Sequence, residues 1–400
     1  FWLVTLLMET TVLRETRLAE RSQAFAFLAA AIYAAHPVQT EAVTYIFQRH
    51  AILVGLLYML SIALYLHWRQ TGKLLWYALC LAAAVLAMKS KANAFTLPVM
   101  IVATEFMFFG GFKKSGDFKK RVLPLVPILL TMLIVPLTLA SLHSGAEPGQ
   151  AASVAETIGK YAAPTKENAS YLITQFRVIP TYLRLLLLPV GQNLDYDYPE
   201  YDTLASAPVV LSLMLLTALG LAGVFCFRAG LKAGIKGKRE LLLVSWGVLW
   251  FFVTLSIESS FVRIPMVINE YRLYLPSAGI ITAAVALAFV VMEGWPSIKK
   301  FRPETVVLGL VIVMLLTRYP MKTVATAPTR AQLFDNLYAE VVTWFGKVPT
   351  GLQSLYTVKT DRIEFTPKPK DSFFSARTAK AEQPEALQGI HRDDGFVLIL

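Results

Sequence analysis

Long apolar runs, separated by short polar stretches, dominate the first 318 residues of this chain. A straight helix needs about 20 apolar residues to cross the core of a bilayer, so the shorter runs must continue into their polar neighbours. The pattern predicts an all-α polytopic membrane protein, a bundle of about nine to ten transmembrane helices with short helices at one face and a small soluble tail. The runs lie at 25–35, 51–66, 74–88, 95–109, 122–142, 208–227, 241–257, 275–292 and 305–317, and residues 1–13 are interpreted as the end of another.

Composition supports the membrane assignment. Hydrophobic residues make up 56% of the chain, charged residues 16%, and the mean hydropathy is +0.54, values that no ordinary soluble domain of this size has. The net charge of +11 comes from short basic clusters between apolar runs, so we expect it to set membrane topology and not to bind nucleic acid. Cys80 and Cys226 lie inside apolar runs, where we expect them to pack and not to bind a metal.

The basic residues divide unequally between alternate loops. Loops on one side hold 18 Lys and Arg residues, whereas the short loops on the other side hold 5. The positive-inside rule places the richer side in the cytoplasm. The unusual polar segments 36–49, 89–93, 143–205 and 258–272 then all fall on the outer side, which indicates that function is concentrated there.

Two regions depart from the pattern of spanning helices. Segment 171–191 is apolar but contains two arginines and two prolines, so an interfacial or re-entrant helix is predicted. After residue 318 Pro, Lys, Asp and Gln become frequent, which predicts a membrane core over 1–318 and a soluble, poorly ordered tail over 319–400 with one amphipathic helix near 333–342. Phe1 opens inside an apolar segment, so we expect the natural chain to begin further upstream.

One polar segment, HPVQTEAV at 36–43, interrupts an apolar run on the outer side. A titratable His and Glu at membrane depth are unfavourable unless they are used, so this segment points to chemistry. Pro37 favours a turn after His36, and such a turn can bring the His36 imidazole, the Thr40 hydroxyl and the Glu41 carboxylate to one pocket. The alternative is structural, with Thr40 or Glu41 capping the helix that follows. Spacing does not choose between these interpretations.

A second polar group, Glu270, Arg272 and Tyr274, directly precedes an apolar run. The Arg272 guanidinium can donate two hydrogen bonds to a phosphate, and Tyr274 can add a hydroxyl donor. Alternatively, Arg272 pairs with Glu270 or reaches any lipid headgroup. Lys89 and Lys91 lie at an outer helix end against the positive-inside trend, which favours an anion nearby, although such lysines are usually interface anchors.

The outer loop at 192–202 alternates carboxylates with tyrosines. Aromatic faces with interleaved polar groups can hold a sugar or a cation, which makes Asn193, Asp195 and Asp197 candidates for a sugar or acceptor loop. Their spacing, without a glycine at the turn, does not match a calcium loop. An ordinary belt of aromatic residues at the membrane surface is the competing interpretation.

Four short phrases, in this order, resemble a known family: HPVQTEAVTYI at 36–46, FTLP at 95–98, NLDYDYP at 193–199 and YLPSAG at 274–279. The chain is similar to the membrane core of bacterial transmembrane and tetratricopeptide-repeat proteins, which are relatives of the protein O-mannosyltransferases with the GT-C glycosyltransferase fold. The match extends over residues 23–318. No single phrase is diagnostic alone, but their combination is specific.

The resemblance implies transfer of a sugar from a polyprenyl-phosphate donor to a hydroxyl acceptor, often on protein, at the outer, periplasmic face of the bacterial inner membrane. It implies no resident cofactor beyond that lipid-linked donor and leaves a divalent metal open. For Arg272 it supports only the location, and the phosphate role is inferred from charge. By matching position, the candidates are His36 and Glu41 for catalysis, with Arg49, Lys91, Glu270, Arg272 and Tyr274 at the donor phosphate.

The chain departs from the family pattern in ways that bear on activity. The acidic outer loop of the family is expected before residue 1, Ala92 stands where relatives carry Glu, and Tyr271 stands where relatives often carry His. The tail does not continue into tetratricopeptide repeats. We therefore expect donor binding with little transfer. Two other functions stay open: a flippase for lipid-linked sugars, which needs inverted repeats and midplane charges, and a non-catalytic membrane scaffold.

Overall fold

The computed structural model describes residues 1–109, 121–143, 165–232, 238–260, 264, 266–294, 356–359 and 362–365. The chain divides into two units, Phe1–Ala325 and Thr326–Leu400. Within the second unit, the described residues form an antiparallel pair of strands, β1 (Tyr356–Lys359) and β2 (Arg362–Phe365). The amphipathic helix predicted near 333–342 lies outside the described residues, as does most of the predicted poorly ordered tail.

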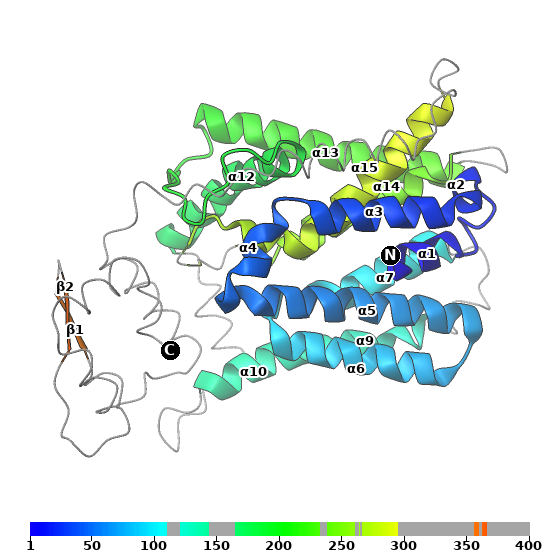
Figure 1. The fold of residues 1–400 in the computed structure, drawn as a ribbon, viewed down its shortest axis with the longest axis horizontal. Coiled ribbons are helices and arrows are strands. Elements are labelled where there is room, and N and C mark those ends of the chain that lie inside the picture. The colour runs from blue at the N-terminus through cyan, green and yellow to red at the C-terminus, as the bar shows by residue number, and fades with distance from the viewer. Residues whose placement is uncertain are drawn as a thin grey trace. The chain divides into compact units, whose positions relative to one another are not determined.

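The first unit is helical throughout its described part. In Figure 1, α3, α5, α6 and α13 run in nearly the same direction. Four short 3-10 turns join or precede longer helices, at Ile46–Gln48, Ala92–Thr96, Thr131–Leu133 and Glu270–Leu273. The helices are α1 (Trp2–Met8), α2 (Arg17–Glu20), α3 (Ser22–Ala35), α4 (Gln39–Thr44), α5 (Arg49–Thr71), α6 (Leu74–Ser90), α7 (Leu97–Phe108), α9 (Leu125–Leu130), α10 (Ile134–His143), α12 (Lys166–Leu187), α13 (Ala207–Lys232), α14 (Leu241–Leu255) and α15 (Tyr274–Gly294).

Three of the described helices are long and apolar enough to cross a membrane: Ile46–Thr71, Ala207–Lys232 and Glu270–Met292. This is consistent with a membrane protein. The predicted total of nine to ten spans is not confirmed, because five other apolar helices have only 10–17 residues. For example, the 14 residues of α3 extend for about 21 Å, less than the roughly 30 Å of a bilayer core. The run predicted at 305–317 lies outside the described residues.

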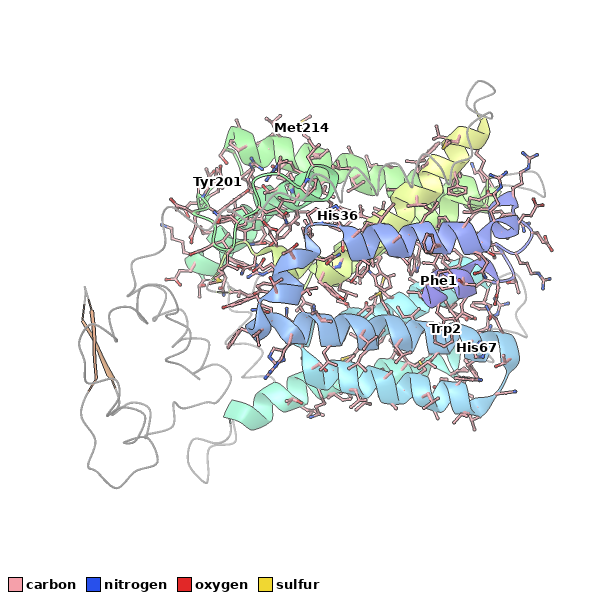
Figure 2. The ribbon with its side chains drawn as sticks, in the orientation of Figure 1. Phe1, Trp2, His36, His67, Tyr201 and Met214 are labelled. Carbon is pink, nitrogen blue, oxygen red and sulfur yellow. The ribbon has the colours of Figure 1, made fainter. Side chains whose placement is uncertain are left out.

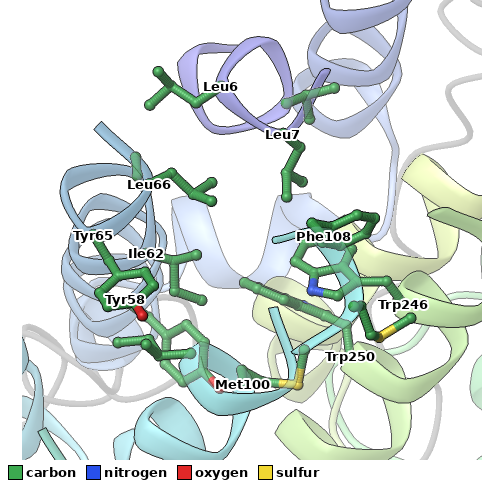
Figure 3. Close-up of a cluster of buried hydrophobic side chains, with 14 of the residues drawn as sticks. Leu6, Leu7, Tyr58, Ile62, Tyr65, Leu66, Met100, Phe108, Trp246 and Trp250 are labelled. Atoms are coloured by element: carbon green, nitrogen blue, oxygen red, sulfur yellow. The ribbon is translucent and has the colours of Figure 1, made fainter. Parts of the chain in front are cut away.

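The interior is held by close approach of α14 and α15. A Cβ atom at Gly279 would lie 2.7 Å from the Gly247 carbonyl oxygen and 2.5 Å from Trp250 Cδ1, so only glycine allows this contact. The Trp250 indole then donates to the Leu275 carbonyl at 2.9 Å. Figure 3 shows Trp250 grouped with Trp246 and other aromatic and aliphatic side chains of the buried cluster.

The prediction that Cys80 packs in an apolar environment is confirmed. Cys80 packs inside the core, where its carbonyl oxygen accepts a hydrogen bond from the Ser61 hydroxyl at 3.0 Å. The segment predicted to be interfacial or re-entrant forms α12, which is absent from the candidate spans among the described helices and includes Pro180. Its buried face, which includes Tyr171 and Tyr182, packs toward the polar turn before α15.

We predict that Gly279→Ala lowers the free energy of unfolding by about 1–3 kcal/mol, because the added methyl group forces α14 and α15 apart. Gly220→Ala is the matched control, since a Cβ there would meet nothing within 4 Å on its helix α13. It should leave stability unchanged or raise it slightly, because alanine is the better helix former. Thermal unfolding of both variants in one detergent measures the difference, and equal midpoints would exclude a tight α14–α15 contact.

Candidate functional site

The polar turn Glu270–Leu273, directly before α15, is the centre of the candidate site. All four of its residues are buried, although two of them carry charge. Buried polar groups need hydrogen-bond partners, and here the partners come from segments far apart in the chain. They are the turn and helix at 36–44, the end of α6 at 91, helix α12 with the loop after it, and residues 258–260 and 266–269. Figure 2 shows His36 where α3 gives way to α4, at the end of the bundle where this site lies.

Glu270 binds the 192–196 loop to the turn through hydrogen bonds. Its carboxylate accepts hydrogen bonds from the Gln192 side-chain amide at 2.6 Å, from the Asn193 backbone N–H at 2.8 Å and from the Tyr196 hydroxyl. Glu270 is fully buried, so these three donors replace the water that an exposed carboxylate would bind. The sequence-predicted pair between Glu270 and Arg272 is not among the ion pairs of the described residues.

Glu41 supports the same turn from the other side. Its Oε2 atom accepts a hydrogen bond from the Tyr271 backbone N–H at 2.9 Å. Burial, together with the neighbouring Glu270 carboxylate, raises the pKa of Glu41 to about 8. Thr40 and Glu41 lie inside α4, and the span that follows, α5, begins after Gln48 with no side-chain cap, so the alternative in which Thr40 or Glu41 caps the following span was wrong. Glu41 instead satisfies a backbone donor 230 residues away.

His36 holds α4 against α12. Pro37 places His36 in an extended conformation and turns the chain into α4, as predicted. The Val38 backbone N–H donates to His36 Nδ1 at 3.2 Å, so the ring proton is on Nε2, which donates to the Leu186 carbonyl at 2.9 Å. Burial lowers the pKa of His36, which favours this neutral form. No hydrogen bond joins His36 to Thr40 or Glu41 among those of the described residues.

Arg272 is buried among oxygen atoms of its own loop. Its guanidinium donates to the Met266 carbonyl at 2.6 Å, to the Val267 carbonyl at 3.1 Å and to the Tyr171 hydroxyl at 3.3 Å. The Nε atom is buried without a hydrogen-bond partner in the described part of the chain. Nη1 and Nη2 therefore stabilise the surrounding loop and its contact with α12, whereas Nε has no partner among the described residues. The phosphate contact of Arg272 stays a prediction.

Lys91 forms an ion pair that sequence reasoning missed. Its Nζ atom lies 2.5 Å from Glu258 Oε1 and 4.9 Å from the centre of the Tyr271 ring. The Tyr171 hydroxyl donates to the Glu258 carbonyl at 2.9 Å, which links this pair to Arg272. Glu258 Oε2 and the adjacent Ser259 hydroxyl are buried without hydrogen-bond partners among the described residues. The only sequence signal for Glu258 was its position in an outer polar segment.

The remaining predicted residues lie around this centre. Arg49 is exposed at the start of α5, and Tyr274 is half-buried, with its ring 5.5 Å from that of Tyr33. Asp195 is half-buried and Asp197 is exposed. Within the described residues, no group of three His, Cys, Asp or Glu side chains is placed to hold a metal ion.

The tyrosines of the 192–202 loop face inward. Tyr196 bonds to Glu270, and the Tyr198 hydroxyl donates to the Arg177 carbonyl of α12 at 2.9 Å. Burial raises the pKa of both phenols, so both are neutral donors at physiological pH. These contacts disfavour an aromatic belt in lipid. They leave Asp195 and Asp197 on the outer side of a loop whose inner side is fixed to the site.

The raised pKa of Glu41 predicts a pH-dependent stability. Unfolded Glu41 loses its proton near pH 4.5, whereas the folded state keeps it until about pH 8, so wild-type stability falls as the pH rises through this window. Glu41→Gln stays neutral and should be more stable than wild type at pH 9, by on the order of 1–3 kcal/mol, with little difference at pH 4.5. Thermal unfolding in detergent from pH 4.5 to pH 9 measures the difference in stability between Glu41→Gln and wild type.

The control for this prediction is Glu167→Gln, which removes an exposed carboxylate in the first turn of α12. Its difference from wild type should not vary with pH in the same window. A constant difference between Glu41→Gln and wild type from pH 4.5 to pH 9 would contradict the burial of a protonated Glu41.

No family model, no curated protein and no solved structure matches the chain. The evidence about function is therefore the sequence resemblance together with the physical chemistry of the cluster around Glu270–Leu273.

Proposed function

We propose that this protein is a membrane glycosyltransferase that takes a sugar from a polyprenyl-phosphate donor and transfers it to a hydroxyl group, at the outer face of a bacterial inner membrane. The acceptor hydroxyl is expected on protein. The donor enters from the lipid, so its phosphate lies at the membrane surface beside the Glu270–Leu273 turn. The GT-C-like bundle, with further spans beyond the three long helices described, is part of the same proposal.

One observation carries the proposal: three of the four phrases that resemble the family converge on a single turn. Glu41 belongs to the first phrase, Asn193 and Tyr196 to the third, and Tyr274 to the fourth, and each belongs to or contacts the segment 270–274. These phrases are separated by up to 230 residues in sequence. Convergence of unrelated polar phrases supports a shared site better than a set of separate helix anchors.

The unpartnered polar atoms favour a ligand-binding site over a scaffold. Native interiors leave few buried polar atoms without a hydrogen bond, and each one invites an explanation. Arg272 Nε, Glu258 Oε2, Ser259 Oγ and Asn193 Oδ1 are all in this state within one cluster. A structural scaffold gains nothing from such atoms, whereas a sugar with several hydroxyl groups can satisfy donors and acceptors together.

Charge location argues against the flippase. A carrier of lipid-linked sugars needs ionisable groups near the bilayer midplane. In the described part of the core, the buried ion pair within the bundle is Arg69 with Glu105, and Arg69 lies in the last turn of α5. Glu240, which is also buried, is the N-cap residue of α14, and the buried charges of the candidate site gather at the opposite end of α5 from Arg69, around Glu41 and Lys91. Charge is therefore concentrated at the two ends and not along a path.

The residues of the cluster suit steps of the transfer. The bond between the sugar C1 and the phosphate oxygen breaks, the acceptor oxygen bonds to C1, and the acceptor proton passes to a base. Lys91 is the cation that we assign to the charge that develops on the leaving phosphate, and Arg272 Nε can donate a further hydrogen bond to it. Glu41, with a pKa of about 8, is the candidate base and is mostly protonated at pH 7, which limits transfer at that pH.

We predict that the full chain in phosphatidylcholine nanodiscs binds polyprenyl phosphate at least about tenfold more tightly than polyprenol of the same length. Lys91→Gln/Glu258→Gln removes both charges of the ion pair together, so no buried charge is left unpaired. This double variant should lose about tenfold in affinity for polyprenyl phosphate and none for polyprenol. Equilibrium binding of radiolabelled lipid measures both.

Lys89→Gln is the matched control, because Lys89 is an exposed lysine two residues earlier that contacts only the Thr138 hydroxyl, at 3.0 Å, among the described hydrogen bonds. It should keep the phosphate preference. Equal binding of polyprenyl phosphate and polyprenol by wild type would overturn the proposed function. A preference that survives in the double variant would instead assign the phosphate to other residues.

A further inference from the structure

A second polar site lies at the far end of α5. A pocket of about 470 Å³ is lined by three arginines, Arg14, Arg69 and Arg121, together with Glu9, Gln70 and Phe109. This volume falls within the range of about 300–1,000 Å³ typical of small-molecule sites, and it exceeds what an inorganic phosphate alone needs. None of these residues belongs to the cluster around Glu270–Leu273.

The position of the pocket matches a membrane surface. Helix α5 has 23 residues and begins beside α4, so its two ends are about 33 Å apart, close to the thickness of a bilayer core. Arg69 and Gln70 lie in its last turn. The pocket and the cluster near Glu41 therefore occupy opposite ends of one membrane-length helix, which places the pocket where headgroups lie (Figure 1).

Arg69 is fixed in place before any ligand arrives. Its Nε and Nη2 atoms each donate to the fully buried Glu105 carboxylate at 2.8 Å, and its guanidinium carbon lies 4.8 Å from the centre of the Phe109 ring. The Tyr65 hydroxyl also donates to Glu105, at 3.0 Å. An arginine held this way loses little conformational entropy on binding an anion, so the site is preorganised.

The walls of the pocket are also fixed. The Thr11 hydroxyl and the Val12 backbone N–H both donate to the Phe108 carbonyl at the end of α7, at 3.1 and 3.3 Å. The Gln70 side-chain amide donates to the Leu6 carbonyl of α1 at 2.9 Å. Three separate segments are thereby joined at one surface, and the arginines they carry are not a chance grouping along one helix.

The positive charge of the pocket lining favours binding of an anion. Three guanidinium groups face one lining carboxylate, Glu9, and the balance stays positive after Glu105 behind Arg69 is included. Guanidinium groups match the oxygens of a phosphate ester geometrically and electrostatically. We propose that this pocket binds the phosphate of an anionic phospholipid headgroup, a role separate from sugar transfer at the other end of the protein.

The test uses the full chain purified in detergent and exposed to phosphatidylglycerol, to phosphatidylcholine, or to phosphatidylcholine with millimolar glycerol phosphate. Native mass spectrometry counts the bound molecules. Wild type should retain phosphatidylglycerol about tenfold more than phosphatidylcholine, and Arg14→Gln/Arg121→Gln should abolish the preference. Arg14→Gln alone should reduce the preference for phosphatidylglycerol by about half as much as the double variant does, on a logarithmic scale. Because Arg14 is exposed, this single variant keeps the test valid if the double variant misfolds.

The control pair is Arg17→Gln/Arg228→Gln, which removes two exposed basic residues that do not line the pocket. It should keep the preference for phosphatidylglycerol. If both double variants lost the preference for phosphatidylglycerol equally, the proposal would be overturned, because diffuse surface charge would explain the preference. Retention of glycerol phosphate with no preference between the lipids would assign the pocket to a free phosphate ester and overturn the lipid assignment.

Discussion

The desolvation of Glu270 is the constraint on which the outer end of this protein depends. A fully buried carboxylate is strongly unfavourable unless donors replace its water, and the Gln192 amide, the Asn193 N–H and the Tyr196 hydroxyl do so. These donors determine where the loop after α12 lies. The same turn then requires Glu41 for the Tyr271 N–H, and that contact determines where α4 lies. One buried turn thus determines the positions of the loop after α12 and of α4, which are both far from it in sequence.

The two ends of the bundle differ in how completely their buried charged groups are paired. At one end Arg69 and Glu105 form a closed pair with two hydrogen bonds of 2.8 Å, which leaves a rigid cation facing a pocket. At the other end the pairing is incomplete, because Arg272 Nε and Glu258 Oε2 lack partners among the described residues. Between them lies an apolar core with close glycine contacts, such as Gly279 against Gly247. Rigid packing in the middle keeps the incompletely paired end in one arrangement, as a binding site requires.

Local features of this structure could be predicted from the sequence, and long-range ones could not. The turn after His36 could be predicted from Pro37, because proline restricts the backbone conformation of the residue before it. The predicted number of spans is not confirmed, because several apolar runs fold into helices shorter than a bilayer core, a difference that hydropathy alone does not resolve. The partnership of Lys91 with Glu258 and of Glu41 with Tyr271 depends on tertiary packing, which no spacing rule encodes. The assignment of Arg272 to a phosphate rested on charge, and charge alone did not predict that its guanidinium also donates to the Met266 and Val267 carbonyl groups.

The most direct test of this account is the position of a lipid phosphate on the protein. A cryo-electron microscopy map of the full chain in nanodiscs with polyprenyl phosphate should show phosphate density within hydrogen-bond reach of Lys91, beside the Glu270–Leu273 turn. The free atoms Arg272 Nε and Ser259 Oγ should border the same density. Phosphate density found only on the lipid-facing surface, with the Lys91 and Glu258 pair unchanged and no density beside it, would contradict the central claim.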